Sequence, residues 1–221
     1  MKTAPGPEPA IQAPRRSLSL GFSDRQVPDG QHICYLYDDD TERRRVMSKY
    51  LDSGLKAGEK VLYLADAVTR AEMLECIQSL GVDTKSPGLD VVPAGATYCP
   101  SKNQFQPEEM LAVVRKYHRQ ALADGYSGVR GSGEMGWCLA DDRVDELRLL
   151  EYEAKLSLLV AECPCTACCQ YDARRFDGRT IWNVLRVHPV MIVRGQLVEN
   201  PFYIEPAAFL REYQARKQPD A

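Results

Sequence analysis

The 221-residue sequence has no phosphate-binding loop after its first β-prone run. Such a loop needs glycines, which let backbone N–H groups surround a phosphate, and a lysine that neutralises it. This chain instead has Tyr37-Asp38-Asp39-Asp40-Thr41-Glu42 at that point. Three consecutive carboxylates repel a triphosphate, so ordinary ATP hydrolysis is disfavoured. The acids could also simply form a turn and cap the helix that follows.

Long apolar runs and an excess of positive charge are also missing. No stretch approaches the roughly 18 consecutive apolar residues of a membrane span, and the proline-rich N-terminus lacks the apolar core of a secretory signal. The formal net charge is -3, whereas nucleic-acid-binding surfaces usually carry a basic excess. We therefore expect a cytoplasmic protein with no direct nucleic-acid partner and no membrane partner.

Catalytic motifs are absent as well. The sequence contains no nucleophile elbow, metalloprotease helix or dinucleotide-binding fingerprint. The three histidines have no nucleophile or carboxylate partner at a convincing spacing, which a catalytic base requires. We therefore expect a binding protein and not an enzyme.

What is present is an alternation of β-prone runs with helical periods. Strands are expected at 32–37, 60–65, 89–92, from 126 and at 168–171, and helices at 41–58, 69–81, 107–122, 144–161 and 180–187. This alternation predicts an α/β fold with a mostly parallel sheet and helices on both faces. A hairpin around Gly195 would add an antiparallel edge. We expect residues 1–25 to be a disordered tail, 26–206 one domain and 207–221 a C-terminal helix or tail.

Two of these helices have clear apolar faces. Pro107 suits the first turn of one helix. In the segment 144–161, Leu147, Leu150, Ala154 and Leu158 recur at helical spacing. We expect both helices to pack these faces against the sheet.

Ligands of open α/β sheets bind beyond the carboxyl ends of the strands. The segment Arg130–Trp137 is the richest candidate there, because its glycines permit unusual backbone shapes. Arg130 and Glu134 could pair with each other or hold a polar ligand, and Trp137 could form a flat apolar wall. A tight connection with an internal ion pair is the alternative. The candidate ligand-binding residues are His32, Tyr37, Asp38, Asp66, Arg130, Glu134, Trp137, Tyr171 and Asp172.

The chain has eight cysteines, four of them within Cys163–Cys169. In a reducing compartment such a cluster indicates metal binding or redox chemistry more often than a structural disulfide. Zn²⁺ or another thiophilic metal is the candidate cofactor. If Cys168 and Cys169 lie on a strand, they point to opposite faces, so plain packing and redox sensing stay open. The candidate metal ligands are Cys163, Cys165, Cys168, Cys169 and His188.

Several short motifs follow one another in the order of a known family. They are Asp29–Cys34, Gly54–Glu59 leading into Tyr63-Leu64, Gly133–Met135 followed by Trp137, Cys169–Asp172, His188-Pro189 and Asn200–Tyr203. Over about residues 28–205 the chain resembles the methanogen/methylotroph DcmR-type sensory domain, called MEDS. The thiols of Cys163, Cys165 and Cys168 are not part of that pattern.

The resemblance implies a RecA/KaiC-like three-layer sandwich with a degenerate nucleotide site, and a signalling role. The family's founder resembles a repressor that responds to dichloromethane, and members occur alone or joined to helix-turn-helix segments or histidine kinases. Because only about 25 residues precede the matching region, we expect a stand-alone sensory domain. It would bind an unknown small molecule at the carboxyl edge of the sheet and regulate a histidine kinase or transcription regulator. A thiol redox or metal sensor is the alternative, an unconventional ATPase is less favoured, and homo-oligomerisation stays open.

Overall fold

The computed structural model describes residues 15–66, 68–100, 104–139 and 144–217. Its strands are β1 (Ser17–Ser19), β2 (Gln26–Pro28), β3 (His32–Tyr37), β4 (Lys60–Ala65), β5 (Leu89–Pro93), β6 (Val129–Glu134), β7 (Cys165–Asp172), β8 (Val190–Val193) and β9 (Gln196–Glu199). Its helices are α1 (Asp40–Lys56), α2 (Arg70–Ser79), α3 (Ala94–Tyr98), α4 (Pro107–Ala123), the 3-10 helix η1 (Met135–Leu139), α5 (Glu146–Glu162), α6 (Gly178–Leu185) and α7 (Pro206–Lys217).

Seven strands form one sheet in the order β5-β4-β6-β7-β3-β8-β9. Every neighbouring pair is parallel except β8 and β9, which pair antiparallel. The turn between these two strands uses Arg194 and Gly195, with φ of 49° and 67°, which is the left-handed region that glycine adopts easily. The predicted mostly parallel sheet with an antiparallel hairpin at its edge is therefore confirmed.

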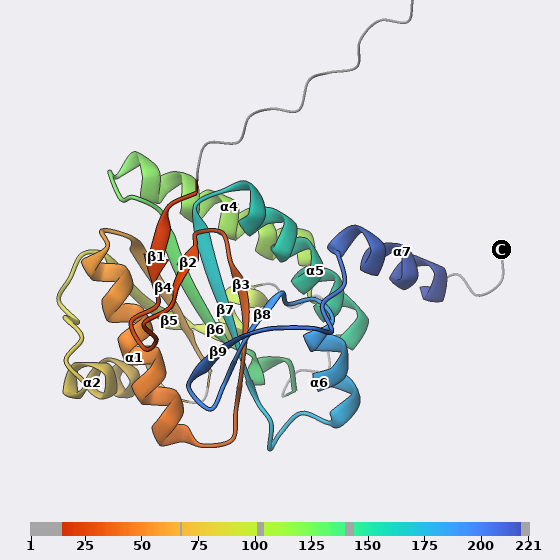
Figure 1. Cartoon of the computed structure of the whole chain (residues 1–221), viewed down its shortest axis with the longest axis horizontal. Coiled ribbons are helices and arrows are strands. Elements are labelled where there is room, and N and C mark those ends of the chain that lie inside the picture. The colour runs from red at the N-terminus through yellow and green to blue at the C-terminus, as the bar shows by residue number, and fades with distance from the viewer. Residues whose placement is uncertain (1–14, 67, 101–103, 140–143, 218–221) are drawn as a thin grey trace, which may run out of the picture.

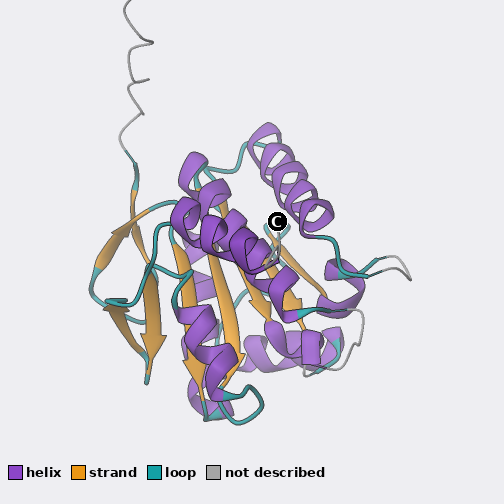
Figure 2. Cartoon of the chain, turned by 90° about the vertical axis from the view of Figure 1, so that its right-hand side faces the viewer, coloured by secondary structure: helices purple, strands orange, loops and turns teal. Residues whose placement is uncertain are grey.

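Helices cover both faces of this sheet (Figures 1 and 2). The face that carries Tyr35 and Cys168 packs on α1 and α2, and the face that carries Cys169 and Tyr171 packs on α4 and α5. Two apolar cores result, one on each side of the sheet. Adjacent cysteines of β7 therefore belong to different cores, as the strand alternation predicts.

Local signals in the sequence explain where the helices begin. The Asp39 carboxylate accepts a hydrogen bond from the Glu42 backbone N–H, so one member of the acidic run caps α1. Thr69 and Glu72 form a reciprocal capping box at the start of α2. Pro107 occupies the first turn of α4, where its missing N–H costs nothing.

The N-terminal expectation needs correction. Residues Ser17–Ser19, which we expected in a disordered tail, form a ribbon with Gln26–Pro28. Leu18 and Leu20 are buried in the core beside α1, so burial of apolar surface holds this ribbon on the domain. Residues 1–14 of the expected tail, and 218–221 at the other end, lie outside the described residues.

Two further expectations differ from the structure. The segment after Pro93, expected as a loop, contains the short helix α3. On α5, Leu158 is 41% exposed, although its spacing predicted that it would face the core. The buried stripe instead includes the polar residues Glu153 and Ser157. Within the described ranges, no helix combines the length and apolarity needed to cross a membrane.

Candidate functional site

Five of the predicted ligand-binding residues do lie at the carboxyl edge of the sheet. They sit at or just after the ends of β3, β4, β6 and β7, and they are Tyr37, Asp38, Asp66, Glu134 and Asp172. Asp38 is exposed, whereas Glu134 and Asp172 are buried. The parallel strands bring these side chains to one edge, as expected.

The carboxylate of Glu134 is the centre of this edge. Its Oε1 accepts hydrogen bonds from Arg43 Nη1 at 2.5 Å and from the Tyr63 hydroxyl at 2.6 Å. Its Oε2 accepts from the backbone N–H of Asp66 at 2.9 Å. Glu134 thus ties α1 and β4 to β6 and neutralises a buried guanidinium, which is a structural task.

Arg174 neutralises two further acids near the edge, Asp172 and Asp40. Arg174 donates to Asp172 at 2.7 Å and to Asp40 at 3.0 Å. These hydrogen bonds lower the pKa of Asp172 below its usual value, against the opposing effect of burial. Arg43 and Arg174 also lie over the ring of Tyr37, at 5.1 and 5.9 Å from its centre. Acidic and basic side chains of the chain itself therefore neutralise one another at this edge.

Arg130 does not belong to this edge, which corrects our expectation. It lies near the amino end of β6 with no exposed surface, and its Nε donates to Glu59 across 2.7 Å. Its Nη1 donates to the backbone carbonyls of Ser19 at 2.9 Å and Tyr50 at 3.2 Å. Arg130 therefore joins the N-terminal ribbon and α1 to the sheet. A pair between Arg130 and Glu134, one of the two possibilities that the sequence left open, does not form, because Arg130 binds Glu59 and Glu134 binds Arg43.

Trp137 is also placed differently from the expected ligand wall. It lies on η1 with 3% of its surface exposed and stacks on Tyr98, with ring centres 4.5 Å apart. Phe105 meets the same indole edge-on at 5.3 Å. The indole is thus part of the core on the α4 side of the sheet, and Tyr98 connects it to a cavity there.

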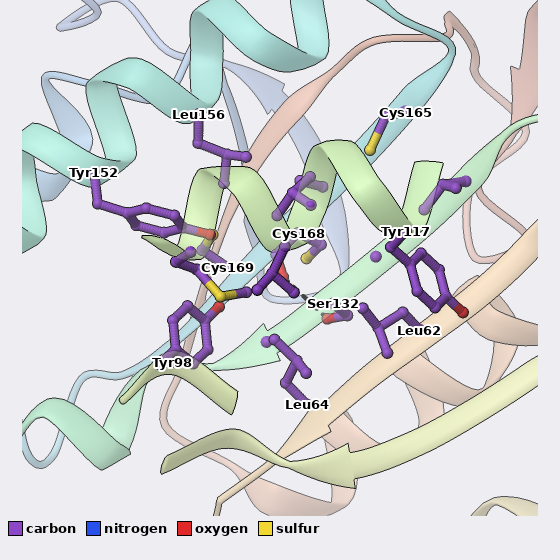
Figure 3. Close-up of a pocket in the computed structure, with 17 residues that line it drawn as sticks. Leu62, Leu64, Tyr98, Tyr117, Ser132, Tyr152, Leu156, Cys165, Cys168 and Cys169 are labelled. Carbon is purple, nitrogen blue, oxygen red and sulfur yellow. Dashed lines mark hydrogen bonds between the residues drawn. The ribbon is translucent and has the colours of Figure 1, made fainter. Parts of the chain in front are cut away.

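This cavity lies between the sheet and the helices α4 and α5 (Figure 3). Its volume is about 50 Å³ and its wall is almost wholly apolar. The lining includes Leu62, Leu64, Tyr98, Met110, Val113, Val114, Tyr117, Val129, Tyr152, Leu156, Cys165, Ala167 and Cys169. Gly131 leaves room for the cavity on the sheet side, because it has no side chain. A Cβ at that position would meet nothing closer than the Thr166 carbonyl oxygen at 4.0 Å.

The five predicted metal ligands do not converge. Cys163 and Cys165 lie near each other at the start of β7, and a hydrogen bond from Cys165 lowers the pKa of the Cys163 thiol. Cys168 is on the α1 side of the sheet. Cys169 and His188 lie together on the α5 side, apart from the other three.

Cys169 and His188 meet a second histidine and an acid that the sequence did not suggest as ligands. One ligand atom from each of His32, Glu153, Cys169 and His188 lies within 4.8 Å of all the others, and all four residues are buried. Glu153 Oε2 is 3.1 Å from His32 Nε2, 3.6 Å from His188 Nε2 and 3.3 Å from Cys169 Sγ. Four separate segments supply this group, which we call the His–Glu–Cys cluster.

Surrounding groups orient the side chains of the cluster. His32 Nδ1 is 2.7 Å from Ser157 Oγ, and His188 Nδ1 is 2.8 Å from the carbonyl oxygen of Val184. The hydroxyl of Tyr171, one of the predicted ligand-binding residues, donates to Glu153 Oε1 at 2.5 Å.

Burial and neighbouring charge shift the pKa values of the cluster. Burial opposes ionisation of Glu153, but His188, His32 and Tyr171 together lower its pKa to about 2. Burial, with a contribution from His32, lowers the pKa of His188 to about 3. Burial and the nearby Glu153 raise the pKa of the Cys169 thiol. The buried carboxylate is therefore charged and needs positive partners.

Comparison with known proteins shows which family the chain belongs to. Residues 31–189 match the model of MEDS, the MEthanogen/methylotroph, DcmR Sensory domain. The chain belongs to this family, and its role is sensory or regulatory. It is 27% identical over 158 residues to the transcriptional repressor DcmR of Methylorubrum extorquens. The match covers 71% of this chain, and the chain spans 57% of the length of that relative.

A solved structure confirms the fold. A KaiC-like protein from the archaeon Pyrococcus horikoshii OT3 superposes with a TM-score of 0.59, over 80% of each chain, at 14% identity. The chain is thus a RecA/KaiC-like three-layer α/β sandwich.

Proposed function

We propose that the chain senses a small apolar molecule, which it binds in the cavity between the sheet and α4 and α5. The observation that carries the proposal is the opening above Gly131, a residue of a central strand that leaves the space of a side chain empty under two helices. This moves the ligand away from the carboxyl edge, where Glu134 and Asp172 already have internal partners. Bound ligand would then bias the packing of α4 and α5.

The dimensions of the cavity define the class of ligand. One water needs about 10–15 Å³ on this measure, so about 50 Å³ suits a molecule of a few heavy atoms. The apolar wall gives no hydrogen bonds to water or to a charged ligand, and desolvation therefore favours an uncharged apolar molecule. Dichloromethane, which the family resemblance suggests, belongs to this size class.

The proposed output is regulation of another signalling protein in the cytoplasm. The relative named as a transcriptional repressor supports a transcription regulator as the partner, and a histidine kinase is the other candidate. We propose binding without catalysis, because the acidic turn at Asp38–Asp40 opposes a bound triphosphate. Incubation with ATP and Mg²⁺ should then give no hydrolysis above a protein-free control.

Trp137 offers a direct way to test ligand binding. Its ring stacks on Tyr98, which lines the cavity, and Trp182 is the other tryptophan of the chain. In a Trp182→Phe background, dichloromethane should change the fluorescence of Trp137 in a saturable manner. The larger cyclohexane should produce no saturable change.

Variants of Gly131 separate cavity binding from non-specific solvent effects. Gly131→Leu fills the cavity and should abolish the saturable signal, and Gly131→Ala should weaken it. Gly178→Leu is the matched control, since a Cβ at Gly178 meets nothing within 4 Å on the far helix α6. If Gly131→Leu folds and binds dichloromethane like the control, the ligand does not occupy this cavity.

A further inference from the structure

We infer that the His–Glu–Cys cluster binds one divalent transition-metal ion of the zinc class. The ligands are His32 Nε2, His188 Nε2, a carboxylate oxygen of Glu153 and Cys169 Sγ. This set differs from the contiguous thiols that the sequence suggested, because it takes one residue from each of β3, α5, β7 and the segment before β8.

The spacing of the donor atoms fits a tetrahedral ion. Metal–ligand distances of about 2.0–2.3 Å place the donors of a tetrahedron about 3.3–3.7 Å apart. Oε2 of Glu153 lies 3.1, 3.6 and 3.3 Å from the donor atoms of His32, His188 and Cys169. Cys169 Sγ lies 3.5 Å from His32 Nε2. Four of the six donor–donor distances thus match a tetrahedral ion, and the other two, both to His188 Nε2, are at most 4.8 Å.

The hydrogen bond between His188 and Val184 fixes the histidine tautomer that a metal needs. The Val184 carbonyl only accepts, so His188 Nδ1 carries the proton and its Nε2 carries a lone pair. This Nε2 is buried and has no hydrogen-bond partner among the described residues. An orphaned buried acceptor is costly, and it points at another acceptor, the carboxylate of Glu153. A cation between them resolves the conflict.

The second histidine is oriented in the same way. When the Ser157 hydroxyl donates to the Val187 carbonyl at 2.9 Å, its Oγ can accept the proton of His32 Nδ1, which is 2.7 Å away. His32 then also turns its Nε2 lone pair toward Glu153. Outer partners that hold the distal ring nitrogen in this manner are typical of metal-bound histidines.

Charge balance supports a dication. A divalent ion, the carboxylate of Glu153, the thiolate of Cys169 and two neutral imidazoles sum to zero. A neutral group is the form that a fully buried site tolerates best. Binding releases the thiol proton of Cys169 to solvent, so no other reactant is required. With four protein ligands and no exposed face, the site is of the closed, structural kind.

Metal content and cobalt spectroscopy of the whole chain test this inference. Protein purified without chelator should contain about one Zn²⁺ per chain. After Zn²⁺ is removed and replaced by Co²⁺, the visible bands of a tetrahedral ion should appear with a thiolate-to-cobalt charge-transfer band. The metal should also raise the melting temperature, because it joins four segments of the fold.

Two neighbouring cysteines provide a matched pair of variants. Cys169→Ser should lose the charge-transfer band and bind Co²⁺ at least 100-fold more weakly. Cys168→Ser, equally buried but on the opposite face, should keep both the band and the affinity. Ser157→Ala, which removes only the partner of His32, should weaken Co²⁺ binding about 10–100-fold.

Two results would overturn the inference that the cluster binds a metal. The cobalt spectrum of the unmodified chain decides the matter even if a variant does not fold. A folded chain that contains no Zn²⁺ and shows no charge-transfer band with excess Co²⁺ overturns the inference. So does a band that Cys168→Ser abolishes and Cys169→Ser leaves intact. Neither outcome requires a ligand in the cavity, although Cys169 also lines it.

Discussion

Arg130 donates its Nε–H to the carboxylate of Glu59 across 2.7 Å, and neither side chain has exposed surface. The pair lies at the amino end of the sheet, where Arg16 also reaches Glu59 at 3.2 Å. A residue that seemed suited to a ligand therefore holds the N-terminal ribbon on the domain. Because the pair is buried, losing one member leaves a charge that water cannot solvate.

Arg130→Ala should consequently destabilise the fold instead of weakening ligand binding. We expect the free energy of unfolding to fall by about 3–5 kcal/mol, as for a broken buried ion pair. Urea denaturation measures this. Arg25→Ala, which breaks the exposed pair with Glu199, should cost at most about 1 kcal/mol. Equal small losses in both variants would contradict a structural role for Arg130.

Gly131→Ala should stabilise the domain. The position lies inside β6 and its φ is not in the left-handed region, so alanine fits the backbone. The added methyl group enters open space above the strand. Loss of conformational freedom in the unfolded chain should raise the free energy of unfolding by about 0.4–1 kcal/mol. A lower midpoint of urea denaturation would show that the space above Gly131 is already filled.

Asp172 should contribute to the acid sensitivity of the domain. Its hydrogen bonds with Arg174 hold its pKa below the ordinary value, so the ionised form stabilises the fold at pH values above that ordinary pKa. This contribution is lost as the pH falls through the lowered pKa, below about pH 4.

The variant Asp172→Asn isolates this contribution. It should be less stable than the original chain at pH 7, and the difference should shrink at pH 3, measured by urea denaturation at both values. Because Arg174 is 46% exposed, the effect should be smaller than that of Arg130→Ala.

Cys163 should be the most reactive thiol of the cysteine-rich segment. It is half-buried, and the hydrogen bond from Cys165 lowers its pKa, while burial raises the pKa values of Cys168 and Cys169. Thiolates react and thiols do not. Timed alkylation followed by mass spectrometry should label Cys163 before the other two. Faster labelling of Cys169 would mean that the α5 side of the sheet opens readily.

Cys163→Ser provides the matching control for the redox alternative. It should remove the fast phase of alkylation, and Cys76→Ser should leave that phase intact. If mild oxidation links Cys163 to Cys165 in the original chain, the thiol sensor becomes a stronger alternative to the apolar-ligand sensor. Retention of both thiols under the same oxidant would argue against it.

Hydrophobic periodicity and turn residues in the sequence were enough to predict most of the helices and strands. The run His32–Tyr37 and its counterpart at 60–65 have the predicted bounds, because short β-prone runs between turn signals have few alternatives. The N-terminal ribbon was missed because a three-residue strand is too short to show a recognisable alternation of apolar and polar residues. Its stability comes from contacts with α1, far away in the chain.

Polar residues on the buried side of α5 explain why the cluster was missed. The predicted positions Leu150 and Ala154 are buried and only Leu158 is exposed, but the buried stripe also includes Glu153 and Ser157, which an apolar period does not count. The available signal was the position of Glu153, three residues after Leu150 and four before Ser157. An analysis of helix periodicity places an acid such as Glu153 on the solvent-exposed face unless a buried partner is known.

The layered α/β architecture, the acidic turn in place of a phosphate loop and the opposite faces of Cys168 and Cys169 could all be predicted from the sequence. Each of these follows from neighbours in the chain. The pairing of Arg130 with Glu59, the cavity at Gly131 and the meeting of His32, Glu153, Cys169 and His188 depend on the folded arrangement. These contacts join residues more than a dozen positions apart, and the crossovers of a parallel sheet bring them together in ways that local propensity does not encode.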